Sequence, residues 1–307
     1  MGEKWTAADI PEQAGRTVVV TGGNSGLGLV AAQALAAAHA DVVLACRNAE
    51  KAEAAAGTIR AAVPGARITV ESLDLSSLDS VRDFAARFAA ERDGLDLLMN
   101  NAGVMAPGER RLTSDGFEMQ LGTNHLGPFA LTGLLLPQMR GREDARVVTV
   151  SSTAHKYGRV RFDDLHGEGS YRRWRGYGQS KMANVLFALE LDRRLQGAGS
   201  GVKSLAAHPG YSATNLQSAE PPALDRAIFA ITNRLLAQGP EMGALPQLYA
   251  GTRPNLDGGL FIGPDGFEEQ RGHPKVVRPV KAGRDEETAA RLWEVSEELT
   301  GVSYEFV

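Results

Sequence analysis

Two residues four positions apart in a helical stretch, Tyr177 and Lys181, form the most chemically suggestive pair in the sequence. Side chains at positions i and i+4 project from the same face of a helix, so both can reach one ligand. A tyrosine ordinarily has a pKa of about 10. An ammonium group about 4 Å away, at an effective dielectric near 20, favours the phenolate by roughly 4 kcal/mol, and burial offsets part of that gain. Tyr177 is therefore a candidate general acid and base near neutral pH.

Two more polar residues are placed to complete such a site. Ser152 ends a β-branched run, where its hydroxyl can bind and polarise a carbonyl oxygen. Asn124 belongs to the preceding helical stretch and is a candidate for holding a water that links Lys181 to solvent. A local backbone hydrogen bond is the alternative role for that asparagine. Because a tyrosine and a lysine at this spacing are common, the chemical interpretation depends on these partners.

A glycine-rich turn, TGGNSGLG at residues 21–28, gives the second chemical signal. Glycine permits positive φ and has no Cβ to obstruct an approaching pyrophosphate. The helix that follows directs free N–H groups and its positive dipole end at the phosphates. A purely structural turn is the alternative, but a position between a first strand and a helix favours dinucleotide binding. The predicted binding residues are Gly22, Asn24, Ser25, Gly26, Leu27 and Gly28.

The end of the second predicted strand indicates which dinucleotide binds. An acidic residue there would accept hydrogen bonds from the ribose 2′-hydroxyl and favour NAD(H). This strand ends in ACRN, with Arg47 and no acid. A guanidinium can bind a 2′-phosphate, so the sequence favours NADP(H), with a merely solvated arginine as the alternative. Residues expected near the adenine and ribose follow the third and fourth strands: Asp74, Leu75, Asn101, Ala102 and Gly103.

The elements that position these residues alternate along the whole chain. Continuous apolar strands that alternate with helices are typical of a parallel sheet covered on both faces. We therefore expect one doubly wound α/β domain at residues 15–307, preceded by an extension at 1–14. The predicted strands are 16–21, 41–46, 67–72, 95–100, 145–152, 202–208 and 259–262. The predicted helices are 26–39, one ending near 62, 77–90 with Ser77 as its cap, 114–139, 174–196 and 285–299.

Two stretches depart from the alternation. Residues 154–173 form a polar inserted loop, and residues 211–240 contain a helix with an apolar face. A surface loop and a core helix are the plain interpretations. Because loops at the carboxyl edge of a parallel sheet commonly hold ligands, a pocket rim and a substrate lid are the functional ones. The apolar candidates for the pocket wall are Leu216, Leu224, Ile228 and Phe229.

Composition excludes several classes of function. A formal net charge of −4 argues against a general binder of nucleic acid or anionic membranes. The six histidines lack metal-ligand spacing, so we expect no metal site. The single cysteine, Cys46, lies in an apolar strand and predicts a buried structural thiol in a reducing compartment. Since no apolar run is long enough for a membrane span, we expect a cytoplasmic protein.

In their order along the chain, these motifs resemble the short-chain dehydrogenase/reductase family. The resemblance spans about residues 15–265, and the last of the ordered motifs is HPGYSAT at 208–214. It implies a single Rossmann domain with a mostly parallel, seven-stranded sheet and helices on both faces. It also implies a catalytic tetrad of Asn124, Ser152, Tyr177 and Lys181, with the last two also binding the cofactor. Pro209, Gly210 and Thr214 are then expected around the nicotinamide.

Three longer segments are similar to the retinol-dehydrogenase-like branch of that family: 151–165, 177–191 and 292–302. Relatives in this branch act on retinoids, steroids, other lipid carbonyls and xenobiotic ketones, so the branch does not assign a substrate. Gly23 stands where relatives often have alanine. Family members often form dimers and tetramers through their long helices, but the 154–173 loop could obstruct one such face. The oligomeric state therefore stays open, with a homodimer and a homotetramer as candidates.

The sequence thus predicts an NADP(H)-dependent oxidoreductase. It would move a hydride between the nicotinamide and a carbonyl or alcohol carbon of a small, fairly apolar substrate. A catalytically silent NADP(H)-binding regulatory protein is the alternative, although such a protein usually lacks a member of the tetrad. Epimerases and dehydratases that use the cofactor as a transient oxidant are typically longer and have a different glycine spacing.

Overall fold

The computed structural model describes residues 4–211 and 238–306. Within these residues eight strands form one sheet in the order β3-β2-β1-β4-β5-β6-β7-β8. Strands β1 to β7 are parallel, and β8 pairs antiparallel with β7. The strands are β1 (Thr17–Thr21), β2 (Asp41–Cys46), β3 (Arg67–Ser72), β4 (Leu97–Asn100), β5 (Arg146–Val150), β6 (Lys203–Ala207), β7 (Phe261–Pro264) and β8 (Pro274–Val277).

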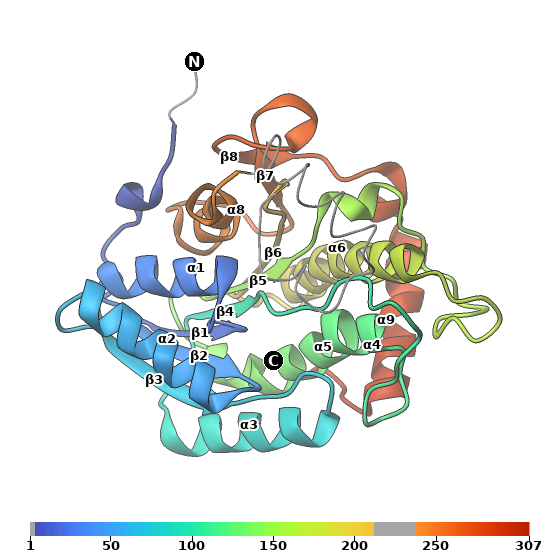
Figure 1. Cartoon of the computed structure of the whole chain (residues 1–307), viewed down its shortest axis with the longest axis horizontal. Helices are drawn as coiled ribbons and strands as arrows, with labels where there is room; N and C mark the ends of the chain where they lie inside the picture. Colours follow the sequence, from blue (N-terminus) through green and yellow to red (C-terminus); the bar gives the residue numbers. More distant parts are fainter. Residues whose placement is uncertain (1–3, 212–237, 307) are drawn as a thin grey trace.

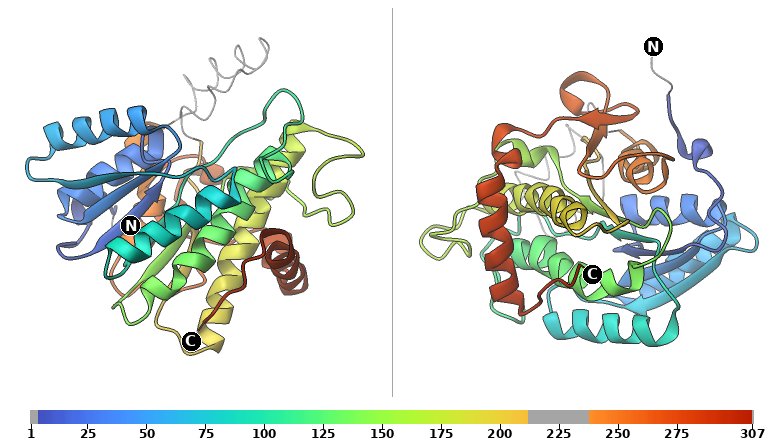
Figure 2. Two further views of the ribbon diagram at one scale, coloured as in Figure 1. Left: turned by 90° about the horizontal axis from the view of Figure 1, so that it is seen from below. Right: turned by 180° about the vertical axis from the view of Figure 1, so that it is seen from behind.

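Helices cover both faces of this sheet. Helices α1, α2 and α8 pack on one face and α3, α5 and α6 on the other (Figure 1), while α9 lies outside α5 and α6 (Figure 2). The α-helices are α1 (Gly26–Ala37), α2 (Ala49–Ala62), α3 (Leu78–Glu91), α4 (Met119–Leu121), α5 (Gly127–Leu135), α6 (Arg173–Gly197), α8 (Pro240–Thr252) and α9 (Glu286–Thr300). Shorter 3-10 helices are Ala7–Asp9, Leu136–Met139, Thr153–Lys156, Phe267–Glu269 and Lys281–Arg284, and Gly122–Leu126 is a π-helical turn.

Successive side chains of a strand point alternately into two apolar cores, one on each face of the sheet. Val18 and Val20 of β1 point into the core beneath α1, α2 and α8. Val19 points into the opposite core, beneath α3, α5 and α6. Because both faces are buried, each central strand is apolar at almost every position, which is the pattern that the sequence displays.

The predicted fold is confirmed, with a correction to the strand count. An eighth strand, β8, follows the strand that the sequence suggested as the last. Its sequence, PKVV, begins with a proline and exposes Lys275 and Val276, so it carries no apolar alternation. Helix α8 was also not predicted, because Pro246 lies inside it and interrupts a helical pattern. The predicted helix 114–139 is instead divided among α4, the π-helical turn, α5 and a 3-10 helix.

The residues that precede β1 pack against the domain. Trp5 is buried, with its ring edge-on to Tyr249 of α8 at a centroid distance of 5.3 Å. The backbone oxygen of Trp5 lies 3.1 Å from Nδ1 of His273, in the loop before β8. These contacts join the predicted extension to the last part of the sheet. No helix in the described ranges is both long and apolar enough to cross a bilayer.

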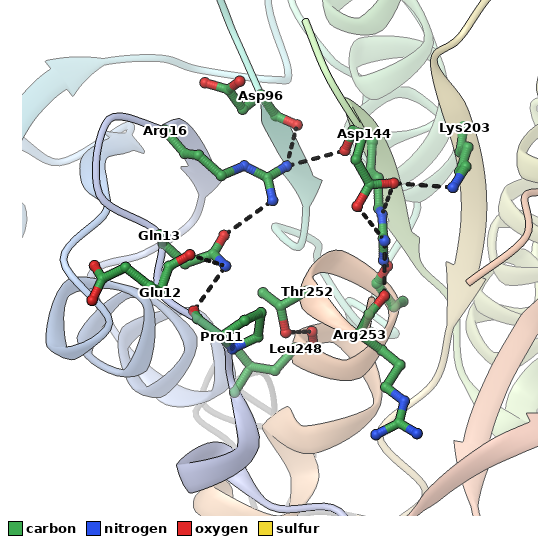
Figure 3. A network of polar contacts seen from close by, with 12 residues as sticks. Pro11, Glu12, Gln13, Arg16, Asp96, Asp144, Lys203, Leu248, Thr252 and Arg253 are labelled. Atoms are coloured by element: carbon green, nitrogen blue, oxygen red, sulfur yellow. Dashed lines mark hydrogen bonds and ion pairs between the residues drawn. The ribbon is translucent and has the colours of Figure 1, made fainter. Parts of the chain in front are cut away.

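A polar network ties together the amino ends of the strands (Figure 3). The fully buried Arg146 at the start of β5 forms an ion pair with Asp144 and donates to the backbone oxygens of Ala250 and Arg253 at 2.9 and 2.8 Å. Asp144 also accepts from Lys203 of β6 at 3.0 Å. This edge of the sheet is therefore occupied by structural contacts, and the opposite, carboxyl edge is left for a ligand.

Candidate active site

The carboxyl ends of β1, β4, β5 and β6 open into a pocket of about 310 Å³. It lies where the strand order changes direction between β1 and β4, which is the usual ligand position in such sheets. The pocket brings together most residues that the sequence singled out: Gly22, Asn24, Ser25, Gly26, Leu27, Gly28, Asn101, Ala102, Gly103, Ser152, Tyr177, Lys181, Pro209 and Gly210.

The glycine turn leads from β1 into α1 and forms one end of the pocket. Gly22 and Gly26 have φ of +66° and +54°, a region that side chains with a Cβ rarely adopt. A Cβ on Gly28 would lie 2.5 Å from both the Gly22 oxygen and Nδ2 of Asn101. The backbone therefore passes close to its neighbours and leaves the first N–H groups of α1 available at the pocket.

The segment after β4 is fastened to this turn. Thr21 Oγ1 accepts hydrogen bonds from the backbone N–H groups of Asn101 and Ala102, each at 3.0 Å. The Asn101 amide donates back to the Thr21 oxygen at 2.9 Å. These three bonds hold the two segments in a fixed relation at the pocket wall.

Tyr177 and Lys181 lie on the face of α6 that borders the pocket. Both are buried, and Lys181 Nζ is 5.8 Å from the centre of the Tyr177 ring. The ammonium donates to the backbone oxygen of Val150, at the end of β5, over 3.1 Å. Ser151 secures the same helix by donating to the backbone oxygen of Lys181 at 2.7 Å. Ser152 begins the next 3-10 helix, and its hydroxyl accepts from the Ala154 N–H at 3.2 Å.

Burial is the main influence on the protonation of this pair. It raises the pKa of Tyr177 to about 12, while hydrogen bonding to Ser152 acts in the opposite direction. It lowers the pKa of Lys181 to about 8. The sequence predicted a lowered tyrosine pKa, and that prediction is wrong, because the desolvation that comes with burial is the largest influence on this pKa. At neutral pH Tyr177 therefore carries a proton that it can donate.

Asn124 lies behind the pocket wall, fully buried in the π-helical turn. Its Oδ1 accepts from the Val104 N–H at 2.7 Å, and its Nδ2 donates to the Val104 oxygen and to Ser180 Oγ, both at 2.9 Å. A Cβ on Gly103 would lie 3.0 Å from Asn124 Oδ1 and 3.5 Å from Lys181 Nζ. The Asn124 side chain thus joins the segment after β4 to α6. Its role in holding a water stays a prediction.

Several predicted residues are outside the pocket lining. Arg47 is exposed and comes directly after β2. The end of β2 lies next to the glycine turn, because the Ala45 oxygen accepts the Gly22 N–H at 2.9 Å. Asp74 Oδ1 accepts from the Ser76 N–H at 2.9 Å, and Leu75 is buried. Thr214 and the four apolar wall candidates, Leu216, Leu224, Ile228 and Phe229, lie outside the described residues.

Eight lining residues were not predicted as site residues from the sequence, and four of them have large side chains: Met105, Tyr157, Trp174 and Tyr211. Tyr157 and Trp174 stand at the two ends of the 154–173 loop, whose middle projects from the body of the molecule (Figure 1). Trp174 is edge-on to Tyr177 at a centroid distance of 6.3 Å. A Cβ on Gly178 would lie 3.0 Å from the Tyr157 ring. Aromatic residues at the borders of a polar loop were the signal that could have found this apolar rim.

Cys46, at the end of β2, is buried. Burial raises the pKa of its thiol to about 11, so the thiolate is scarce at neutral pH. This agrees with the structural role that the sequence predicted.

Comparison with known proteins gives the same result by another route. The model of the "short chain dehydrogenase" family matches residues 16–224. The chain is 40% identical to human retinol dehydrogenase 13, with 94% of this chain and 85% of the relative covered. It is 39% identical to mouse retinol dehydrogenase 14, with 94% and 86% covered.

Solved structures are similar over comparable lengths. The crystal structure of an uncharacterized protein from Mycobacterium paratuberculosis has a TM-score of 0.82 and 44% identity, and 99% of this chain and 100% of that one are covered. A Pseudomonas aeruginosa RhlG/NADP active-site complex has a TM-score of 0.64 and 26% identity, with 83% and 97% covered. The chain therefore belongs to the short-chain dehydrogenase/reductase family of oxidoreductases and is retinol-dehydrogenase-like.

Proposed function

We propose that the protein is an NADP(H)-dependent oxidoreductase. It transfers a hydride between the nicotinamide and a carbonyl or alcohol carbon of a small, fairly apolar substrate. The observation that carries this proposal is the convergence of Tyr177, Lys181 and Ser152 with the glycine turn in one pocket. Asn124 completes the proposed tetrad as a residue that positions its neighbours.

The pocket fits a dinucleotide. A Cβ on Gly28 would meet the Gly22 backbone oxygen at 2.5 Å, so the tight turn that directs the first N–H groups of α1 at a pyrophosphate requires glycine there. We assign the 2′-phosphate to Arg47, the adenine and ribose to Asp74, Leu75 and the Asn101–Gly103 segment, and the nicotinamide to Pro209, Gly210 and Thr214. Bound there, NADP(H) supplies the hydride donor or acceptor. The similarity to a protein described as an NADP complex supports this choice of cofactor.

The residues of the chain then handle the substrate oxygen and its proton. With a pKa of about 12, Tyr177 is protonated at neutral pH and donates its proton to the carbonyl oxygen during reduction. In oxidation the Tyr177 phenolate, the form that the reductive step leaves, accepts the proton from the alcohol. Ser152 donates a hydrogen bond that orients the substrate oxygen. The Lys181 ammonium, buried beside the tyrosine, stabilises the phenolate that forms and binds the ribose.

The apolar rim supports the proposed class of substrate. Tyr157 and Trp174 offer rings at the pocket, and Met105 adds an adaptable apolar contact. The retinol dehydrogenases among the relatives are in keeping with an aldehyde or ketone on a retinoid-like or steroid-like body. Most of the proposed lid, 211–240, lies outside the described residues.

The test is consumption of NADPH or NADH by the purified protein with a panel of aldehydes and ketones. We expect turnover with NADPH, and we expect Tyr177→Phe to reduce it by about 10²–10⁴-fold while cofactor affinity stays nearly intact. Tyr249→Phe is the matched control, since Tyr249 packs against Trp5, away from the pocket, and should leave turnover unchanged. Equal turnover in Tyr177→Phe would refute the mechanism, and tight NADPH binding without turnover would favour the silent regulatory protein.

A further inference from the structure

His208 connects the last central strand to the nicotinamide end of the pocket. It follows β6 directly, is completely buried, and precedes Pro209 and Gly210, which line the pocket. The Gly210 N–H donates to His208 Nδ1 at 3.3 Å. That nitrogen must therefore be unprotonated, which leaves the proton of the neutral ring on Nε2. Nε2 lies 3.3 Å from Oε2 of Glu269.

The Glu269 carboxylate is shared between His208 and a lysine from another segment. Lys156 Nζ lies 3.3 Å from the same Oε2 atom. The Glu269 side chain is 22% exposed, whereas that of its neighbour Glu268, 3.9 Å from the same ammonium, is 65% exposed. Hydrogen bonding to His208 is the main reason that the pKa of Glu269 falls to about 2, and Lys156 lowers it further. The carboxylate is therefore charged at neutral pH.

Lys156 belongs to the short helix that begins at Ser152. The residue before it, His155, is buried, and its Nδ1 lies 2.7 Å from the backbone oxygen of Ser152. The rings of His155 and His208 are 6.2 Å apart, and both contact Phe261 of β7. Glu269 thus stands between the segment that carries the proposed substrate-orienting serine and the segment that leads to the nicotinamide.

The backbone around Glu269 is equally constrained. Gln270 accepts the Tyr211 N–H at 2.8 Å, and a Cβ on Gly210 would lie 2.4 Å from the same Gln270 oxygen. Glu268 and Glu269 have φ of +50° and +59°, values that residues other than glycine rarely adopt. Such a conformation persists only where surrounding contacts determine it, and the contacts of Glu269 with Lys156 and His208 are among them.

We propose that Glu269 is a positioning residue, whose carboxylate fixes the Pro209–Gly210 segment relative to Ser152 and so aligns the nicotinamide with the substrate oxygen. This inference rests on the proposed function. Hydride transfer is sensitive to small displacements, because a misplacement of about 1 Å can reduce a rate by about 10²-fold. Glu269 does not line the pocket, so it acts through His208 and Lys156.

The experiment compares Glu269→Gln with Glu268→Gln in the NADPH-loaded protein. Glutamine keeps the size of the side chain but removes its charge. For Glu269→Gln we expect kcat to fall by roughly 10-fold or more, KM for the carbonyl substrate to change little, and the isotope effect with deuterated NADPH to rise. Glu268→Gln should match the unmodified protein in all three. Unchanged kcat and isotope effect in Glu269→Gln, or equal losses in both variants, would overturn the inference.

Two additions make the result decisive. Lys156→Met removes the other half of the bridge, so it should reproduce the kcat loss, and the double variant with Glu269→Gln should be no worse than the single ones. The fluorescence of bound NADPH reports the nicotinamide environment without turnover. A change in this fluorescence in Glu269→Gln but not in Glu268→Gln supports the inference, even if no carbonyl is reduced. Failure to reduce any carbonyl would contradict only the proposed function. Identical spectra in all three proteins would refute the positioning role.

Discussion

At the scale of the residue, the choice of cofactor depends on Arg47. It is exposed directly after β2, beside the strand that leads to the glycine turn. We expect Arg47→Ser to weaken NADPH binding by about 10–100-fold, because a charged hydrogen-bonded contact contributes about 1.5–3 kcal/mol, and to leave NADH binding nearly unchanged. Titration of each cofactor measures this. Arg60→Ser, near the other end of α2, is the control and should bind NADPH and NADH as before. Unaltered NADPH affinity in Arg47→Ser would remove the basis for the proposed NADP(H) preference.

Tyr177 illustrates what residue type alone leaves open. The spacing to Lys181 correctly put both side chains on the pocket face of α6. Their protonation, however, is governed mainly by how completely they are buried. An estimate from spacing omits that desolvation cost, which is the largest influence on both pKa values.

At the scale of the element, the turn between β1 and α1 depends on close backbone approach. In Gly28→Ala the new Cβ would stand 2.5 Å from the Gly22 oxygen, and backbone cannot give way as a flexible side chain can. We expect about 1–3 kcal/mol less stability and at least 10-fold weaker NADPH binding. Gly57→Ala in α2 is the control, since its Cβ would meet nothing within 4 Å. It should raise the free energy of unfolding by about 0.5–1 kcal/mol, and chemical denaturation distinguishes the two.

Gains of similar size from both alanine variants would show that the turn tolerates a side chain.

Elements with a strong local pattern were predicted closely. The bounds of β2 and β3 match the prediction, and Ser77 caps α3 by accepting the Ser80 N–H at 3.3 Å. Elements without one were missed. Strand β8 is held by backbone pairing with β7. Its four residues show no apolar alternation, so the sequence carries no signal for a strand there.

At the scale of the whole molecule, the amino-edge network joins β5 to the end of α8 (Figure 3). In Arg146→Met the buried oxygen of Ala250 and the partly buried oxygens of Asp144 and Arg253 lose a donor. We expect the free energy of unfolding to fall by about 3–5 kcal/mol with turnover per folded molecule retained, because the site lies at the opposite edge. Urea unfolding and NADPH turnover measure the two quantities. Arg193→Met is the control: it removes a half-exposed guanidinium from the buried Glu190 of α6, which stays paired with Arg194, and it should cost at most about 1 kcal/mol. An equal loss in both variants would contradict the assignment.

The sequence by itself determined the doubly wound α/β fold, the order of its first seven strands along the chain, the glycine turn and the polar residues of the pocket. These follow from local information, namely apolar periodicity, helix spacing and glycines where backbone must pass closely. The tertiary structure alone decided the eighth strand, the raised pKa of Tyr177, the burial of Asn124 and the bridge from Lys156 through Glu269 to His208. Each of these depends on contacts between segments far apart in the chain, and burial and charge pairing act through space rather than along the sequence.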